Sequence, residues 1–211
     1  MSSIKTSAHS TADTPTAPAT PANPTADPGP LGLAGFAATT LVLSFVNAGI
    51  VGAGVAAAVL PLALFYGGLA QLIAGIMEFR KGTTFGATAF CTYGPFWMAF
   101  AFFNWFFAKD AGADTSSAVG MFLLVFTIVT AYLAVASLAT NGALVAVFVL
   151  LALTFLFLTI GAFGEADGMT KIGGWLGVIT AVVAFYTSFA VVTNDTWKRT
   201  VLPVFPMAPR A

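Results

Sequence analysis

The polar side chains that could contact a solute form a narrow stripe near the start of the chain. Phe36, Thr40, Ser44 and Asn47 recur at steps of four, four and three residues. At 100° per residue in a helix, these positions fall within about 80° of one another. Hydroxyl and amide groups in an apolar span need partners or water. The stripe therefore predicts either hydrogen bonds between helices or one wall of a polar pathway.

A second helical face combines small residues with an amide and a carboxyl group. Gln71 is the polar group deep in the apolar stretch 56–79, and Glu78 lies near its end, beside Arg80 and Lys81. An acid in this position fits an interfacial ion pair or a carboxylate that couples transport to protons. Both interpretations of Glu78 remain open at this point.

The next apolar stretch has two distinct faces. Thr88 and Thr92 share one face, and we expect them to line a pathway, whereas Tyr93 lies roughly opposite. Gly94 and Pro95 interrupt the stretch, and proline in a helix interior removes a hydrogen bond and favours a kink. The helix is therefore expected to bend near mid-span.

Residue types exclude most catalytic chemistry. The chain has one cysteine and one histidine, so the usual metal and haem ligand sets cannot be assembled, and no metal or cofactor is expected. No phosphate-binding, nucleophile-elbow or zinc-protease motif is present. No pair of acids lies inside one apolar stretch for acid–base work. An enzyme is therefore not expected. A transport pathway without a fixed charge at its centre suits small solutes that are neutral or weakly charged.

The composition indicates a membrane protein, whose surface faces lipid. Hydrophobic residues make up 58% of the chain and charged residues 8%, with zero net charge, whereas soluble domains carry about 25% charged residues. The stretch from Pro28 to Met77 contains no ionisable side chain. A membrane crossing needs roughly 20 apolar residues, so this stretch accommodates two. The neutral balance also argues against nucleic acid as a partner.

Six apolar stretches predict an all-α membrane protein with six transmembrane helices. Residues 1–30 are rich in Pro, Ser, Thr and Ala, which predicts a disordered tail, and residues 194–211 form a short C-terminal tail. One membrane domain, residues 31–193, lies between them. Its expected helices are 31–52, 56–79, 84–107, 117–138, 141–163 and 170–193.

Loop charges predict the orientation of these helices. With the N-terminus inside, the basic residues of the cytoplasmic segments outnumber those of the outer loops, so the positive-inside rule favours cytoplasmic termini. The inner set comprises Lys5, Arg80, Lys81, Lys198, Arg199 and Arg210, and the outer set Lys109 and Lys171.

Several motifs resemble those of the acetate uptake transporter family, which includes bacterial succinate–acetate permeases and fungal ammonia/acetate exporters. The family signature N-P-A-P-L-G-L stands here as DPGPLGL at 27–33, followed by Phe36 and Thr39-Thr40. A second block runs from FYGGLAQ at 65–71 to GTTFGATAF at 82–90, and Tyr93-Gly94 and Phe96-Trp97 continue it. The matching region extends from residue 27 to about residue 203.

The resemblance implies a function and an assembly. Members carry acetate and related small carboxylates, sometimes succinate, and are described as proton-linked; each six-helix protomer has its own pore, and six protomers assemble in the plasma membrane. The family's narrow constriction corresponds to Phe36, Tyr93 and Leu151, and a further selectivity position corresponds to Ala184. The predicted partners are therefore the carboxylate, a proton, the bilayer and five further copies of this chain.

The start of the first helix is the expected pore entrance. Pro28, Leu31 and Gly32 belong to the signature there, and a helix N-terminus presents free N–H groups that favour anions. Asp27 replaces the signature asparagine and Gly29 the signature alanine. The carboxylate of Asp27 would repel an anion unless it is protonated or paired. Either Asp27 or Glu78 could relay a proton.

Two other functions remain possible on the sequence alone. Ammonia or ammonium export needs a path that attracts a cation, and Asp27 with Phe36 offers a minimal version of one. A membrane scaffold that transports nothing would use the polar stripe for packing alone. Competition between labelled acetate and ammonium separates the two transport functions, and a complete lack of solute flux would indicate the scaffold.

Overall fold

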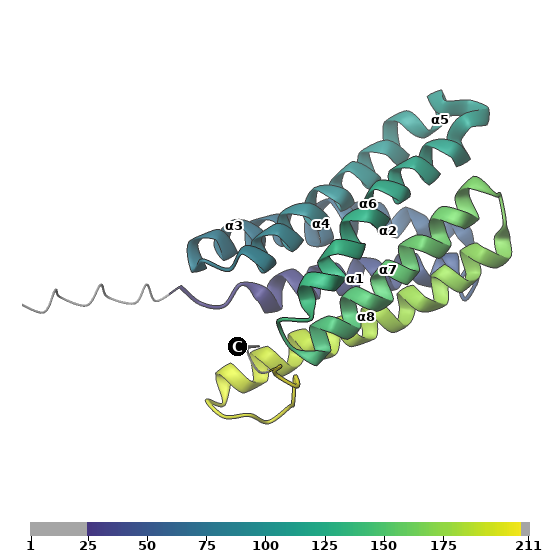
Figure 1. The fold of residues 1–211 in the computed structure, drawn as a ribbon. Coiled ribbons are helices and arrows are strands. Elements are labelled where there is room, and N and C mark those ends of the chain that lie inside the picture. Colours follow the sequence, from purple (N-terminus) through teal and green to yellow (C-terminus); the bar gives the residue numbers. More distant parts are fainter. Residues whose placement is uncertain (1–24, 208–211) are drawn as a thin grey trace, which may run out of the picture.

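The structure, a computed structural model, describes residues 25–207 as an elongated bundle of helices (Figure 1). Most of the predicted N-terminal tail lies outside the described residues, and the first helix begins at Gly29. The elements are α1 Gly29–Asn47, η1 Ala53–Val55, α2 Ala56–Leu64, η2 Phe65–Ala70, α3 Gln71–Lys81, α4 Thr84–Phe102, η3 Phe103–Phe107, α5 Ala108–Ala111, η4 Gly112–Asp114, α6 Thr115–Ser137, α7 Gly142–Phe163 and α8 Asp167–Thr196.

Within the described residues, five continuous helical stretches are long and apolar enough to cross a membrane. One of them, Thr84–Ser137, has 54 residues and is far longer than a crossing requires. This stretch reverses direction around α5, so that α4 and α6 run as separate rods (Figure 1). Counting these two rods separately gives the six expected segments, and the predicted all-α membrane architecture is confirmed.

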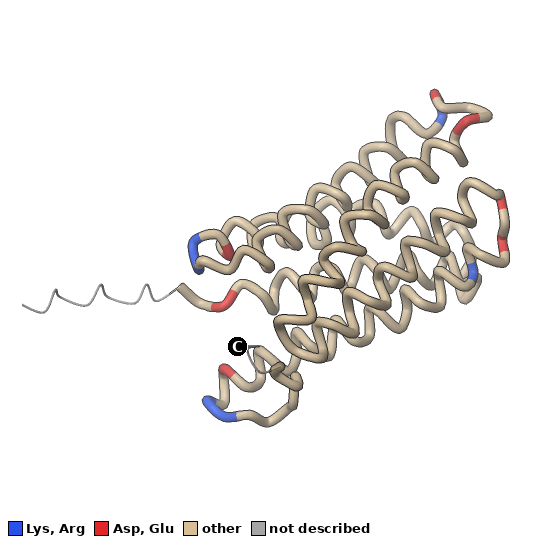
Figure 2. Tube along the Cα trace, in the orientation of Figure 1, with Lys and Arg blue, Asp and Glu red and all other residues tan. Residues whose placement is uncertain are grey.

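Charged residues gather at the two ends of the bundle and leave its middle free of them (Figure 2). We call the end where α1 begins and α3 ends the proximal end, and the end that holds the α7–α8 turn the distal end. Arg80, Lys81, Lys198 and Arg199 lie at the proximal end, and Lys109 and Lys171 at the distal end. Lys5 and Arg210 lie outside the described residues.

Local sequence explains where individual helices end or change geometry. Gly82 ends α3 in the left-handed conformation with φ of 81°, which glycine adopts without steric cost. The side chain of Asn141 accepts a hydrogen bond from the Leu144 amide at 2.9 Å and so caps α7. Pro61 lies one turn before the π-helical η2. By contrast, α4 continues through Pro95 to Phe102.

Small residues allow the helices to approach closely. A Cβ at Gly94 in α4 would lie 2.8 Å from the backbone nitrogen of Leu72 in α3. A Cβ at Gly173 in α8 would lie 2.8 Å from the side chain of Leu158 in α7. These contacts follow the rule that membrane helices pack through small residues. The core between the helices is aromatic, with Phe36, Tyr93, Phe96, Phe148 and Phe155 in one cluster.

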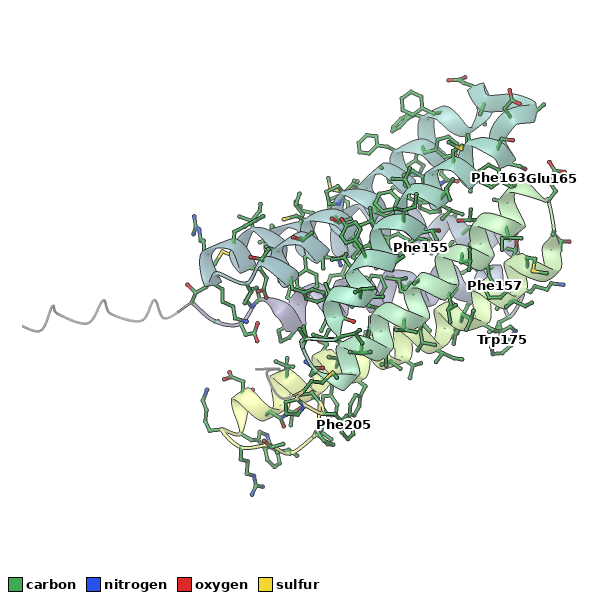
Figure 3. All side chains as sticks on the ribbon, in the orientation of Figure 1. Phe155, Phe157, Phe163, Glu165, Trp175 and Phe205 are labelled. Carbon is green, nitrogen blue, oxygen red and sulfur yellow. The ribbon has the colours of Figure 1, made fainter. Side chains whose placement is uncertain are left out.

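The segment that follows α8 returns to the start of α7. The amide of Gly142 donates to the carbonyl of Phe205 at 2.8 Å, and the amide of Met207 donates to the carbonyl of Thr140 at 3.1 Å. Figure 3 shows Phe205 at the proximal end of the bundle, far from Glu165 at the distal end. The residues predicted as a C-terminal tail are therefore attached to the bundle as far as Met207.

Candidate functional site

Two cavities follow one another along the inside of the bundle. The proximal cavity has a volume of about 280 Å³ and reaches Asp27 and Lys81 at the proximal end. The distal cavity has a volume of about 910 Å³ and reaches Glu165 and Asp167 at the distal end. Phe36 and Leu151 line both cavities. The cavities thus meet at these two side chains, which lie on α1 and α7.

Three buried apolar side chains, the predicted constriction, lie around the junction of the two cavities. Phe36, Tyr93 and Leu151 are each at most 4% exposed, and the ring centroids of Phe36 and Tyr93 are 5.8 Å apart. The hydroxyls of Tyr93 and Thr130 share a hydrogen bond of 2.8 Å, which ties α4 to α6. The ring of Tyr93 also stacks on Phe155 of α7, with centroids 6.5 Å apart. Phe36, Tyr93 and Leu151, which the resemblance assigns to the constriction, all line the proximal cavity.

Charged groups surround the mouth of the proximal cavity. Lys81 Nζ lies 2.8 Å from Asp27 Oδ1 and 3.9 Å from Glu78 Oε1. Glu78 is only 3% exposed, and the hydroxyl of Thr83 donates to its Oε2. Asp27 is therefore paired with a cation, and the mouth as a whole holds two carboxylates and one ammonium group.

The amide of Gln71 is the polar group deeper in the proximal cavity. Its side chain is 1% exposed, and its Oε1 has no hydrogen-bond partner among the described residues. A buried polar atom without a partner costs roughly 1–3 kcal/mol unless water or a solute supplies the hydrogen bond. Gln71 is thus suited to contact whatever enters this cavity.

One hydroxyl on the distal side of the constriction is also unpaired. Thr40 lines the distal cavity, and its buried Oγ1 has no partner within the described residues. The other buried threonines donate to the carbonyl four residues earlier, namely Thr39, Thr130, Thr154, Thr159, Thr180 and Thr187. The hydroxyl of Thr40 is therefore free to bond to an occupant of the distal cavity.

Other residues of the predicted stripe continue along the same cavity. Ser44 and Asn47 line the distal cavity on the side of α1. Trp97 lines it from α4, and its buried Nε1 is another polar atom without a partner in the described part of the chain. Of the two interpretations of the stripe, the wall of a polar pathway agrees better with these positions.

Several predicted residues lie away from both cavities. Thr88 and Thr92 line neither cavity, because α4 directs Phe85, Ala89 and Tyr93 inward instead. The expectation that this threonine face lines the pathway is therefore not met by the described structure. The helical period revealed two faces but did not indicate which of them points inward.

The remaining predicted positions lie outside both cavities. Pro28 is buried, Leu31 is 45% exposed, and Ala184 is fully buried in the core. None of these three lines either cavity. Gly32 does not line a cavity either, but a Cβ there would lie 2.6 Å from the ring of Phe90, which lines the proximal cavity.

Lys81, Thr83 and Trp97 are among the cavity-lining residues that the sequence did not predict as site residues. The sequence predicts Lys81 as a loop charge and as a neighbour of Glu78 in a possible interfacial ion pair, and in the structure Lys81 Nζ lies 3.9 Å from Glu78 Oε1. Thr83 had no distinguishing signal in the sequence. Trp97 stood in a motif of the resemblance, and a buried indole N–H needs a partner, which would have been the signal to find it.

The comparisons with known proteins agree with one another. The sequence profile of the GPR1/FUN34/yaaH family matches residues 10–209. The chain is 44% identical to Ammonia transport outward protein 2 of Saccharomyces cerevisiae over 78% of its own length, which spans 61% of the yeast protein. It is 37% identical to the Succinate-acetate/proton symporter SatP of Escherichia coli, covering 85% of this chain and 95% of that protein.

A solved structure extends the similarity to three dimensions. This structure, described as that of the bacterial acetate channel SatP, superimposes with a TM-score of 0.78 at 34% sequence identity. The match covers 85% of this chain and 99% of the solved one.

Proposed function

The chain belongs to the GPR1/FUN34/yaaH family, and from this membership we propose that it moves acetate and related small carboxylates, succinate among them, across a membrane. It is a multi-pass membrane transport protein and not an enzyme. The similar Escherichia coli protein is named a succinate-acetate/proton symporter, and the similar solved structure is described as an acetate channel.

This proposal rests mainly on the two cavities that follow one another along the inside of the bundle. Each cavity ends at Phe36 and Leu151, and each contains an unpaired buried polar atom within reach of an occupant. An apolar constriction between two cavities can close by losing its water. Small solutes then pass when the side chains move apart, while larger solutes are retained.

The chemistry of the lining suits a carboxylate that is only partly dehydrated. Hydroxyl, amide and indole groups can replace water around the anion without a permanent countercharge that would trap it. Conduction requires binding that is favourable enough for entry yet weak enough for release. The neutral groups Gln71 and Thr40, which line the proximal and the distal cavity respectively, meet this requirement.

Proton linkage would involve the acids at the proximal mouth. Glu78 lines the proximal cavity beside Thr83 and Lys81, so a solute in that cavity could exchange a proton with it. Asp27 provides a second acid at the same mouth. The alternative is that the proton travels on the carboxylic acid itself.

A flux assay tests the proposed function directly. Purified full-length protein in liposomes should release trapped labelled acetate faster than protein-free liposomes, and C2–C4 carboxylates should compete. An imposed pH gradient should change the acetate flux if transport is proton-linked, and flux that ignores the gradient would indicate a channel. Liposomes whose acetate flux does not exceed that of protein-free controls would overturn the proposal.

Ammonium export is the second candidate, because one observation favours it. The proximal mouth combines two carboxylates, Asp27 and Glu78, with one ammonium group, Lys81. This excess of negative charge would attract a cation. Unlabelled ammonium that inhibits acetate flux no more than sodium does would argue against a shared path for both solutes.

Assembly and orientation are further parts of the proposal. We propose that the chain forms a homohexamer in the plasma membrane, with the proximal end in the cytoplasm. The charge distribution supports this orientation, since four basic residues lie at the described proximal end and two at the distal end (Figure 2). Native mass spectrometry measures the number of copies, and a reporter fused after residue 211 identifies the side of the C-terminus.

A further inference from the structure

Two donors converge on one carboxylate oxygen at the mouth of the proximal cavity. Lys81 Nζ lies 2.8 Å from Asp27 Oδ1, and the backbone N–H of Gly29 donates to the same oxygen at 2.9 Å. One donor is an ammonium group at the end of α3, and the other is a free amide in the first turn of α1. This combination of charge and N–H group is suited to any carboxylate.

The group bound between these donors is chemically close to the proposed solute. The side chain of aspartate is a methylene and a carboxylate, which is acetate with one hydrogen replaced by the main chain. The pair is also accessible, since the side chains of Lys81 and Asp27 are 35% and 41% exposed and both line the cavity. A carboxylate from solution can therefore reach the same donors.

The residue at position 29 makes room for this arrangement. A Cβ at Gly29 would lie 3.1 Å from Asp27 Oδ1 and 3.5 Å from Glu78 Oε1. Alanine, the signature residue at this position, would therefore crowd the oxygen that Lys81 binds. Asp27 and Gly29, the two residues that differ from the signature, are thus sterically compatible, because glycine leaves room for the Asp27 carboxylate.

A second observation indicates a solute deeper in the same cavity. Gln71 lines the proximal cavity and is 1% exposed, with its Oε1 unpartnered in the described part of the chain. This oxygen is an acceptor, so a carboxylic acid or water that leaves the mouth can donate to it, whereas a carboxylate can bond only to the N–H donors of the same amide. The cavity thus presents a charged donor at its mouth and a neutral amide further in.

We propose that Lys81 Nζ and the backbone N–H of Gly29 form a carboxylate-binding site at the proximal mouth, and that the Asp27 side chain occupies this site when no solute is bound. Asp27 is then an internal competitor of the solute. An arriving carboxylate displaces it, and the released side chain turns toward water. The inference rests on the proposed function, because the competitor matters only if carboxylates pass through this cavity.

Removing the competitor tests the proposal. Asp27→Asn should lower the half-saturating acetate concentration in the liposome flux assay by roughly two- to fivefold, the range expected for one partly exposed ion pair. Lys81→Gln should raise this concentration, because the charged donor is lost. Asp195→Asn is the matched control, since Asp195 pairs with Lys198 at 2.9 Å and lines neither cavity.

The double variant separates competition from general charge repulsion. In the Lys81→Gln background, Asp27→Asn should lower the half-saturating concentration much less than it does in the wild-type chain, because only the Gly29 N–H is then left for Asp27 to occupy. A decrease as large as that in the wild-type chain would show that Asp27 merely repels anions. Gly29→Ala should act in the same direction as Asp27→Asn in the wild-type chain, and much less in the Asp27→Asn background.

The outcomes also separate this inference from the proposed function. Wild-type protein without acetate flux overturns the proposed function. Wild-type flux with an unchanged or raised half-saturating concentration for Asp27→Asn, in protein that elutes as the wild type does in size-exclusion chromatography, overturns the binding site alone. Should Asp27→Asn fail to fold, Gly29→Ala provides the same test with the carboxylate retained.

Discussion

At the residue scale, single atoms distinguish the pathway from the packing around it. Most buried threonine hydroxyls bond to their own helix, whereas the hydroxyl of Thr40, the amide oxygen of Gln71 and the indole nitrogen of Trp97 have no partner among the described residues. These three side chains line the cavities on the two sides of the constriction. Bonds to water or solute would recover the energy that these atoms otherwise lose on burial.

Phe36→Ala should join the two cavities. The ring of Phe36 lines both of them, so its removal should cause a leak and admit larger carboxylates such as butyrate several-fold faster. The measurement is efflux of labelled acetate and butyrate from liposomes. Phe189→Ala is the control, since Phe189 is 61% exposed and lines neither cavity. Unchanged flux and selectivity in Phe36→Ala would count against a gate at this position.

Tyr93→Phe should affect stability more than selectivity. The variant loses the bond to Thr130, but the Thr130 hydroxyl keeps its 2.6 Å bond to the Phe126 carbonyl. The expected loss is about 0.6 kcal/mol, the average for hydrogen bonds between membrane helices. Unfolding in detergent measures this loss, and acetate selectivity should stay the same because the ring remains. Altered selectivity would show that the hydroxyl itself contacts the solute.

At the element scale, the rotation of α4 decides which residues reach the pathway. Phe85, Ala89 and Tyr93 line the proximal cavity, whereas the threonine face points away from it. The glycines of α3 and α4 explain this rotation, since a Cβ at Gly75 would lie 2.7 Å from the backbone nitrogen of Cys91. The two helices can meet this closely only along their glycine faces.

Gly94→Ala should separate α3 from α4. The added Cβ would lie 2.8 Å from the Leu72 nitrogen and 2.9 Å from the Gly68 carbonyl oxygen, and backbone atoms cannot move aside as a flexible side chain can. Overpacking of this kind costs about 1–3 kcal/mol. Thermal unfolding measures the loss. Gly168→Ala in α8 is the control, because nothing lies within 4 Å of its Cβ, and equal stability of the two variants would contradict the close packing.

At the scale of the whole molecule, a lipid environment explains why apolar side chains cover the surface of the bundle. Large apolar side chains are exposed along the helices, among them Ile128, Val135 and Phe189, and charges are confined to the two ends (Figure 2). Such a surface is stable in hydrocarbon or against further copies of the chain. Both environments exclude an unpaired charge from the middle of the bundle.

Ile128→Lys should impair membrane insertion. Ile128 lies near the middle of α6 and is 61% exposed, and a lysine at the centre of a span costs about 2.5–3.5 kcal/mol in insertion experiments. The yield of protein in the membrane fraction should therefore fall. Val201→Lys is the control, because this residue lies at the proximal end where charges already occur. Equal yields of the two variants would contradict a lipid-facing or copy-facing position for Ile128.

The sequence by itself determined the class of the fold and the family. Apolar length and the absence of charge from Pro28 to Met77 predict membrane helices, because backbone groups in lipid must be satisfied within a helix. The Phe36 stripe also followed from sequence, since its four positions lie on one helix and the period of that helix relates them directly. The family followed from motifs that are contiguous in the chain.

Only the tertiary structure decided which faces and which distant residues meet. The inward face of α4 depends on how its glycines pack against α3, and no period within one helix contains that information. Asp27 and Lys81 are 54 positions apart, and their contact exists because the start of α1 lies against the end of α3. Contacts between helices depend on the rotation and axial register of both partners, which are set when the bundle packs.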